Sequence, residues 1–373
     1  MPWHHFSSPA EQWANMPSFL IGEYAFIVLA AIALVHATRS GRDHLLIWLG
    51  ALIAGTANDQ IFMALPLVDN FWQAQATVML TVRMPLYIPC VYVCFMYYPT
   101  VAVRRLGLDP WASAAAVGLL AMVFYAPYDI MGAKFMWWTW HDTDPPIDAR
   151  LLGAPVSSSL WILTFVSTFS FLLDRAIRDH GAELPWPRFA LGLALVGGLT
   201  TLVMMVQMTI LQQLDGGTPR YFAYTGGVSL YVGVLIWRGR EFQPRPALAL
   251  DRLLYAAVVA YFSMFPLLMA SFDPTTHRSL GVHQPAGECY VDEKDVTGLT
   301  RHKYLCVTDY EEDFTFECVD SPPAGAAETR WYTTCGKAHT NKAGHVAGVS
   351  ILGAVGILLF SLLVGPLRRK PNG

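Results

Sequence analysis

The sequence predicts an all-α polytopic membrane protein with about nine transmembrane helices and a small, disulfide-stapled, partly β domain in an outer loop. Three observations predict this fold class. Of the 373 residues, 54% are hydrophobic and only 14% are charged, whereas a soluble domain carries about a quarter charged residues. Nine apolar stretches are long enough to cross a bilayer. Four cysteines fall in one polar segment between the last two stretches.

Each apolar stretch has about the 20 residues that a helix needs to cross hydrocarbon. Backbone groups inside lipid must be satisfied within the protein, so each stretch is expected to be a helix rather than an open strand. The stretches are 18–37, 45–65, 78–98, 112–133, 154–173, 189–211, 221–237, 253–271 and 346–364.

These stretches divide the chain into four regions. An outer N-terminal segment (1–17) precedes an eight-helix membrane core (18–271). A cysteine-rich outer cap (272–345) follows, and then a ninth span with a basic cytoplasmic tail (346–373). The first region holds no Lys or Arg, so it lacks the basic start of a secretory signal peptide.

Positive charge alternates between successive connections and predicts the orientation. One set of connections and the tail are rich in basic residues: Arg39, Arg42, Arg104, Arg105, Arg175, Arg178, Arg188, Arg238, Arg240, Arg245, Arg252, Arg368, Arg369 and Lys370. The alternate short connections carry only Lys134, Arg150 and Arg220. The positive-inside rule makes the first set cytoplasmic. The N-terminus and the cysteine-rich loop are then non-cytoplasmic, and the C-terminus is cytoplasmic.

The cysteines of the cap predict two disulfides, because the cap lies on the oxidising side. They are Cys289, Cys306, Cys318 and Cys335, and sequence alone leaves three pairings open. A zinc site with His302 and His339 is the alternative, but no C-x-x-C pair occurs. The alternation of residues 314–318 predicts a short strand. Cys90 and Cys94 lie in a span and are interpreted as packing residues.

Five polar side chains within the predicted spans are candidates for function, because ionisable groups in lipid are costly. They are Glu23, Asn58, Asp59, Arg83 and Asp129. The predicted orientation places all of them in the outer third of the bilayer. A packing role is the alternative, in which Arg83 pairs with Asp59 or Glu23 and performs no chemistry.

The end of the fourth span runs into an aromatic and acidic loop, residues 128–146. Its tryptophans are typical of a membrane interface. His141, Asp142 and Asp144 predict a divalent-cation site, because carboxylates bind hard cations and imidazole binds transition metals. A simple turn is the alternative, since Asp and Pro gather in turns.

Residues 126–165 resemble the membrane carotenoid enzymes that include heterodimer-type lycopene cyclases and the carotenoid hydratases of the bacterioruberin pathway. The matching residues are Asp129, Trp138-Thr139-Trp140, Gly153-Ala154-Pro155, Ser157 and Trp161. The cyclases carry a pair of acids after the Gly-x-Pro element, where this chain has Ser157-Ser158-Ser159. That departure favours the hydratase-like pattern. The aromatic and acidic loop also looks like that of an uncharacterised membrane family.

The resemblance implies an enzyme of isoprenoid or carotenoid biosynthesis, within lipid metabolism, that performs cyclase- or hydratase-type acid–base chemistry. A carboxylic acid in apolar surroundings can stay protonated at neutral pH and protonate a polyene, while indole faces stabilise the cation. We expect Asp129 to be the acid, assisted by Asp59 or Glu23, with Arg83 holding the charge of the network. The remaining expected site residues are His141 among the catalytic groups, and Trp138, Trp140, Asn58 and Trp161 against the substrate.

Three other functions stay open. A transporter or channel would place its site near the midplane between repeats, and no internal repeat is evident by eye. A structural subunit would use the cap and the aromatic surfaces to bind partners in a membrane complex. A metal or redox enzyme would use the outer histidines with Met204, Met205 and Met208, which suit copper. The sequence contains no basic block typical of nucleic-acid binding.

Overall fold

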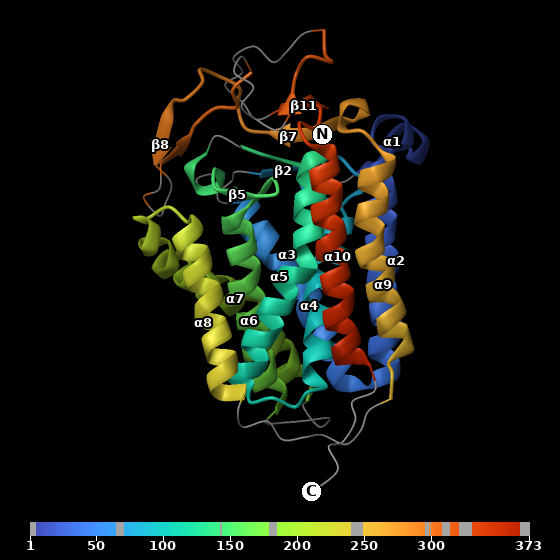
Figure 1. The fold of residues 1–373 in the computed structure, drawn as a ribbon, viewed down its shortest axis with the longest axis vertical. Coiled ribbons are helices and arrows are strands. Elements are labelled where there is room, and N and C mark those ends of the chain that lie inside the picture. Colours follow the sequence, from blue (N-terminus) through green and yellow to red (C-terminus); the bar gives the residue numbers. More distant parts are fainter. Residues whose placement is uncertain are drawn as a thin grey trace, which may run out of the picture.

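A computed structural model describes residues 5–64, 71–141, 144–178, 185–239, 249–294, 298, 300–307, 314–320 and 330–365. Long helices run side by side in one bundle, and short strands gather at one of its ends (Figure 1). We refer to residues 272–341, which carry five of the eleven described strands, as the cap. The short helix α1 (Pro9–Asn15) lies at the same end as the cap, and the last turn of α10 (Lys342–Val364) lies at the opposite end (Figure 1).

The other long helices of the bundle are α2 (Pro17–Ser40), α3 (Arg42–Ala64), α4 (Tyr87–Arg104), α5 (Pro110–Lys134), α6 (Val156–Arg178), α7 (Trp186–Leu211), α8 (Tyr221–Arg238) and α9 (Arg252–Ser271). Within the described residues, seven helices are long and apolar enough to cross a membrane: α2, α3, α5, α6, α7, α9 and α10. Many of their large apolar side chains are exposed on the outside of the bundle, where lipid would cover them. The chain is a multi-pass helical membrane protein, as the composition predicts.

The predicted span 78–98 is wrong in its first half. Residues Val78–Met79 form strand β3, which pairs antiparallel with β1 (His5–Phe6), and helix α4 begins only at Tyr87. The Leu86 amide donates to the Val78 carbonyl at 2.9 Å, which closes a tight turn before the helix. Pro85 lies inside this turn and has no amide hydrogen to donate to a helix. The apolar composition of the segment concealed this change of structure.

Arg83 therefore lies in a turn and not in a helix. Its guanidinium donates to the Met63 carbonyl at the end of α3, at 3.4 Å, and to the Phe71 carbonyl at 3.2 Å. Backbone carbonyls at a helix end and in a strand are ordinary acceptors for an arginine. These contacts join the turn to its neighbours.

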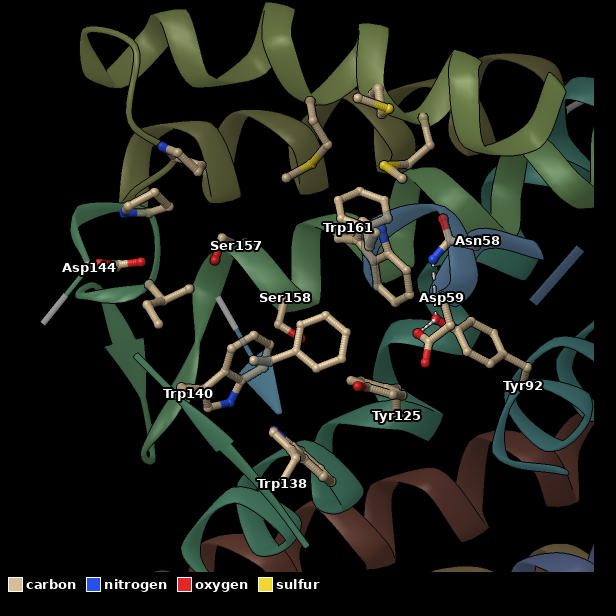
Figure 2. A pocket seen from close by; sticks show the side chains of 18 of the residues that line it. Asn58, Asp59, Tyr92, Tyr125, Trp138, Trp140, Asp144, Ser157, Ser158 and Trp161 are labelled. Atoms are coloured by element: carbon tan, nitrogen blue, oxygen red, sulfur yellow. Dashed lines mark hydrogen bonds between the residues drawn. The ribbon is translucent and has the colours of Figure 1, made fainter. Parts of the chain in front are cut away.

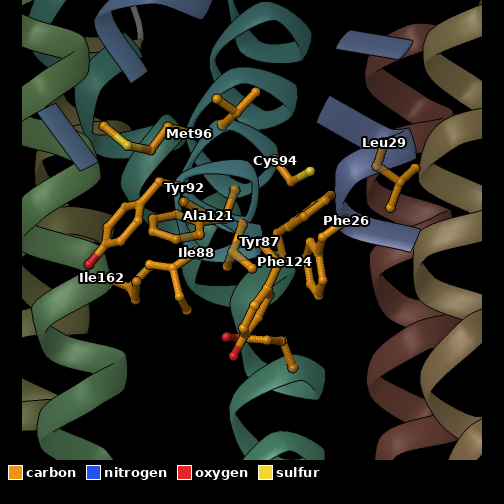
Figure 3. Close-up of a cluster of buried hydrophobic side chains, with 14 of the residues drawn as sticks. Phe26, Leu29, Tyr87, Ile88, Tyr92, Cys94, Met96, Ala121, Phe124 and Ile162 are labelled. Atoms are coloured by element: carbon orange, nitrogen blue, oxygen red, sulfur yellow. The ribbon is translucent and has the colours of Figure 1, made fainter. Parts of the chain in front are cut away.

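Aromatic side chains fill the centre of the bundle. Figure 3 shows residues of α2, α4, α5 and α6 meeting there, among them Phe26, Tyr87 and Phe124. The Phe124 ring stacks on that of Tyr261 from α9 at 3.8 Å between centroids, and the Tyr261 hydroxyl donates to the Phe124 carbonyl at 2.7 Å. Buried Cys94 lies in this apolar cluster, as its interpretation as a packing residue predicts.

Glycine lets the helices approach closely. A Cβ at Gly55 of α3 would lie 2.2 Å from the Tyr92 ring of α4, and one at Gly118 of α5 would lie 2.6 Å from the Leu163 carbonyl of α6. Membrane helices commonly use small residues in this way, because apolar lipid supplies no hydrophobic force to press helices together.

The cap is built on a three-stranded antiparallel sheet in the order β10–β11–β7. Its strands are β7 (Arg278–His283), β10 (Phe314–Thr315) and β11 (Arg330–Gly336). The remaining short strands are β2 (Phe71–Gln73), which pairs with β4 (Trp138–Trp140), β5 (Arg150–Leu151) with β6 (Ala154–Pro155), and β8 (Asp292–Lys294) with β9 (Thr300–His302). Residue Ala74, just after β2, bridges to Gly281 of β7, so the cap is joined to the loops that cover the helix ends.

Two disulfides fasten the cap, as its cysteine content predicts. They join Cys289 to Cys306 and Cys318 to Cys335. The second bond lies beside the sheet, since Cys335 is in β11 opposite Thr315 of β10. All four cysteines are therefore bonded to one another, and none is left to bind zinc. Of the predicted strand 314–318, only residues 314–315 form a strand, and a turn follows them.

His277 holds the cap to the bundle. Its Nδ1 donates to the Asp273 carbonyl at 3.1 Å, which leaves Nε2 to accept from the Ser18 hydroxyl of α2 at 2.7 Å. The Trp137 indole donates to the same hydroxyl oxygen at 3.2 Å. Burial lowers the pKa of His277 to about 4, so the ring is neutral in the folded protein.

We predict that Gly55→Ala destabilises the protein. The added methyl group would overlap Tyr92, whose Cβ and ring both lie near, and overpacking of this kind costs about 1–3 kcal/mol in free energy of unfolding. The matched control is Gly192→Ala in α7, where a Cβ meets nothing within 4 Å. The measurement is the thermal unfolding midpoint in detergent. Equal midpoints for the two variants would contradict the packing at Gly55.

We also predict that the cap loosens as pH falls. An unfolded histidine binds a proton near pH 6.5, whereas folded His277 does so only near pH 4. Stability conferred by neutral His277 is therefore complete above about pH 6.5, falls between these values, and levels off below about pH 4.

The measurement is the rate of proteolysis of the cap at pH 7 and at pH 5. The variant His277→Gln keeps a donor and an acceptor but does not titrate, so its rate should change less between the two pH values. The prediction fails if the wild type and this variant show the same pH dependence.

Candidate functional site

A cavity of about 230 Å³ lies within the cap-side half of the bundle, lined by residues of α3, α4, α5, α6 and α7 together with β2, β4 and the cap. Its walls are mostly aromatic and thioether side chains: Phe62, Phe71, Phe95, Tyr125, Tyr128, Trp138, Trp140, Trp161, Met204, Met205 and Met208. Polar groups lie at two opposite sides of the lining, Asn58 and Asp59 at one and Asp144 at the other (Figure 2). The cavity thus suits a mainly apolar occupant with polar contacts at its ends.

A chain of hydrogen bonds leads to Asp59. The Tyr92 hydroxyl donates to Asp59 Oδ1 at 2.7 Å and accepts from Asn58 Nδ2 at 3.2 Å. Asn58 Oδ1 accepts from the Thr201 hydroxyl at 3.1 Å. Every donor in this series points toward Asp59, and aligned donors reinforce one another in a dry environment. The arrangement stabilises negative charge on the carboxyl group.

Helical spacing brings these groups to the cavity. Asn58 and Asp59 occupy the last turns of α3, Tyr92 is in the second turn of α4, and Thr201 lies in α7 one turn before Met204 and Met205. Residues three and four apart share a helix face, so α7 presents both Thr201 and its methionines on this side.

The opposite end of the cavity lies under the cap. Asp144 is fully buried, and its Oδ1 accepts from the His302 amide at 2.8 Å. Arg301, from the same cap strand, also lines the cavity and is 6% exposed. Burial raises the pKa of the Asp144 carboxyl, although His141, Arg301 and the His302 amide oppose this shift.

The turn that ends α5 places the two tryptophans of β4. The Trp137 amide donates to the Gly132 carbonyl at 2.8 Å and the Met136 amide to the Ala133 carbonyl at 3.0 Å, with Met136 at φ 55°. This is a Schellman motif, which reverses the chain just past a helix. Side chains two apart on a strand face the same way, so Trp138 and Trp140 both reach the cavity.

Several predicted site residues converge in this cavity: Asn58, Asp59, Trp138, Trp140, Asp144 and Trp161. The predicted orientation places Asn58 and Asp59 in the outer third of the bilayer, and the structure brings these two into one cavity with the tryptophans. Trp161 stacks on Phe165 one turn along α6, at 5.3 Å between centroids, and its edge faces Tyr92.

Glu23 is not among the cavity-lining residues. Its carboxylate accepts from the Thr77 amide at 3.0 Å and from the Thr77 hydroxyl at 2.8 Å. These bonds fasten the segment before β3 to α2. Arg83 also lies outside the lining, bonded to backbone carbonyls as described above.

Asp129 is fully buried in α5 but does not line the cavity. Neither of its carboxyl oxygens has a hydrogen-bond partner among the described residues. Burying a polar group without a partner is costly, and burying a charge costs far more. Asp129 has the buried environment expected of the predicted acid. Asp59 has the expected position, because it lines the cavity.

The two described members of the predicted cation site are each bonded to the backbone of the cap. His141 Nε2 donates to the Tyr304 carbonyl of the cap at 2.9 Å, and Asp144 Oδ1 is bonded to the His302 amide. Asp142 lies outside the described residues. Among the side chains that the structure describes, no group of three or more His, Cys, Asp and Glu residues could hold a metal ion.

Sequence reasoning missed Tyr92, Thr201 and Arg301. Tyrosine and threonine are ordinary in membrane helices, and only the neighbouring helix reveals what their hydroxyls bind. Arg301 follows Asp144 by more than 150 residues, so no local pattern joins the two. The sequence makes Met204 and Met205 candidate copper ligands, but in the structure they form part of an apolar wall of the cavity.

Comparison with known proteins identifies the family and no activity. The chain matches no curated protein and no solved structure. The resemblance of residues 126–165 to carotenoid enzymes therefore stays a prediction. A family described as a domain of unknown function, DUF7802, matches residues 3–364. Because this match spans nearly the whole chain, the protein belongs to the DUF7802 family.

Proposed function

We propose that this protein is an integral membrane enzyme that performs acid–base chemistry of the cyclase or hydratase type on an isoprenoid or similar lipid. The observation that supports the proposal most directly is the carboxyl group of Asp59, which lines an aromatic cavity and is backed by three hydrogen-bonded side chains. Carboxyl groups in apolar pockets are effective proton donors and acceptors.

Asp59 exchanges the proton with the substrate in this proposal. Protonated Asp59 gives its proton to one carbon of a double bond and becomes a carboxylate, and the other carbon becomes a cation. Tyr92 stabilises the new carboxylate through its 2.7 Å hydrogen bond. Water then adds to the cation and gives up a proton to Asp59. In a cyclisation, a second double bond attacks the cation instead, and the new cation formed by that attack loses a proton to Asp59.

The walls of the cavity suit a cationic intermediate. The faces of Trp138, Trp140 and Trp161 carry negative electrostatic potential and attract cations at short range. Asp129 lies one residue beyond Tyr128, a member of the lining, and serves in this proposal as a proton reservoir rather than the donor.

We further propose nine membrane spans, with the N-terminus and the cap non-cytoplasmic and the C-terminus cytoplasmic. Helices α4 and α8 then cross the membrane with the other seven. The arginines at the ends of α2, α4 and α8 lie at the end of the bundle away from the cap, which supports this orientation. The two disulfides support an oxidising compartment for the cap. The cavity then lies in the outer part of the bilayer.

Asp59→Asn is predicted to abolish proton transfer to the substrate. Purified protein in liposomes that contain lycopene, squalene and geranylgeraniol is incubated in D₂O, and deuterium bound to carbon is measured by mass spectrometry. Wild-type protein should label one of these lipids, and the variant should do so at least about 100-fold more slowly.

The matched control is Asp43→Asn, since Asp43 is half exposed and pairs with Arg104 at 3.7 Å far from the cavity. It should label the lipid at the wild-type rate. Labelling by the Asp59 variant at that same rate would remove Asp59 from the mechanism.

The orientation predicts which introduced cysteines react from outside intact cells. Asp292→Cys in the cap should react with a membrane-impermeant maleimide, because the Asp292 side chain is 69% exposed. Leu250→Cys, between α8 and α9, should react only after the cells are opened. The opposite pattern would reverse the proposed orientation.

A further inference from the structure

The cap-side end of the cavity contains a carboxyl oxygen that no donor satisfies. Asp144 is 0% exposed and lines the cavity, and its Oδ2 has no hydrogen-bond partner among the described residues. A buried acceptor without a donor is costly, because it has lost water and gained nothing in return. An occupant of the cavity that donates a hydrogen bond would remove this cost.

The position of Asp144 is fixed by its surroundings. Its amide donates to the His141 carbonyl at 2.9 Å, and its own carbonyl accepts from Ile147 at 3.0 Å in the short helix η1 (Pro145–Ile147). Oδ1 is held by the His302 amide of the cap. These bonds hold the loop and Oδ1 in place, and Asp144 lies in the cavity lining, so we expect an occupant of the cavity to reach the second oxygen.

Arg301 adds a donor of opposite charge at the same end. It lines the cavity, is nearly buried, and interacts electrostatically with Asp144. A ligand group at this end thus meets one acceptor and one cationic donor together. The pair has no net charge when Asp144 is ionised.

This pairing discriminates among head groups. A phosphate would be attracted by Arg301 but repelled by Asp144. An ammonium group would be attracted by Asp144 but repelled by Arg301. A hydroxyl group can donate to Asp144 Oδ2 and accept from Arg301 at once, without introducing a charge into a dry site.

We propose that the cavity binds a lipid alcohol, with its hydroxyl group between Asp144 and Arg301 and its chain extending along the aromatic and methionine walls toward Asp59. Figure 2 shows the corresponding placement, with Asp144 on one side of the cavity, Trp161 between, and Asp59 on the other. This inference rests on the proposed function, because it names the class of substrate for the same cavity. The head group is held at one end and the double bond to be protonated lies at the other.

The test is equilibrium binding of tritiated geranylgeraniol to purified full-length protein in lipid nanodiscs. Competitors that share its chain are geranylgeranylamine, geranylgeranyl phosphate and the corresponding hydrocarbon without a head group. The alcohol should bind at least about tenfold more tightly than each competitor, because only the hydroxyl satisfies both polar groups.

Variants identify the group that recognises the hydroxyl. Asp144→Leu should weaken binding of the alcohol by at least about tenfold, whereas Asp144→Asn should keep it within a few fold, because an amide still accepts from a hydroxyl. Asp148→Asn is the matched control in the same loop, where Asp148 forms an exposed pair with Arg220, and it should bind like the wild type. Size-exclusion profiles establish that each variant is folded.

Each alternative head group predicts a different binding result. Tighter binding of the amine, with its loss in Asp144→Asn, would assign the site to an ammonium group. Tighter binding of the phosphate would assign it to an anion, and equal binding of the hydrocarbon would deny it any head-group role. Each of these results overturns the proposal.

The two proposals can fail separately. If the alcohol binds as described but no lipid gains deuterium, then the proposed enzyme activity fails and the alcohol site stands. If a lipid gains deuterium but the alcohol does not bind, then the alcohol site fails alone.

Discussion

The turn that ends α5 is the constraint on which the candidate site depends. Met136 adopts a left-handed conformation there, which a residue with a side chain adopts only at a cost. The Schellman hydrogen bonds to Gly132 and Ala133 support that conformation. A Cβ at Gly132 would lie 2.1 Å from the Trp138 ring, so only glycine allows this tryptophan to fold back against the helix. This contact sets the position of Trp138 in the wall of the cavity.

The same turn connects the cavity to the cap. Trp137, between the turn and β4, donates to the Ser18 hydroxyl that also binds His277 of the cap. β4 pairs with β2, and the residue after β2 bridges to β7. One reversal of the chain therefore positions the cavity wall, the start of α2 and the base of the cap together. A change at any of these contacts would therefore displace the others, because closely packed elements transmit strain.

Polar groups are tolerated in this apolar interior because most of them are bonded to one another. Thr201, Asn58, Tyr92 and Asp59 form a directed series that no single helix could supply. Glu23 is similarly satisfied by Thr77. Asp129 and the second oxygen of Asp144 differ, since neither has a partner in the described part of the chain. Unsatisfied buried groups in a native protein require an explanation, and the proposed ligand would supply one for Asp144.

The sequence by itself determined the long helices, the multi-pass class and the disulfide-fastened cap, because these follow from local composition. A bilayer imposes about 20 apolar residues on every spanning helix, and an oxidising compartment favours pairing of cysteines. It also placed Asp59 and Asp129 at one depth. It failed at residues 78–86, where an apolar segment pairs as a strand and turns instead of continuing a helix.

The tertiary structure decided which polar groups share a cavity. Depth in a membrane can be read from charge and span length, but the direction of a side chain depends on the rotation of each helix against its neighbours. Asp59 and Asp129 have equivalent sequence signatures, yet only the first lines the cavity. The pairing of Asp144 with Arg301 joins loops that are far apart along the chain, and no local pattern encodes such a contact.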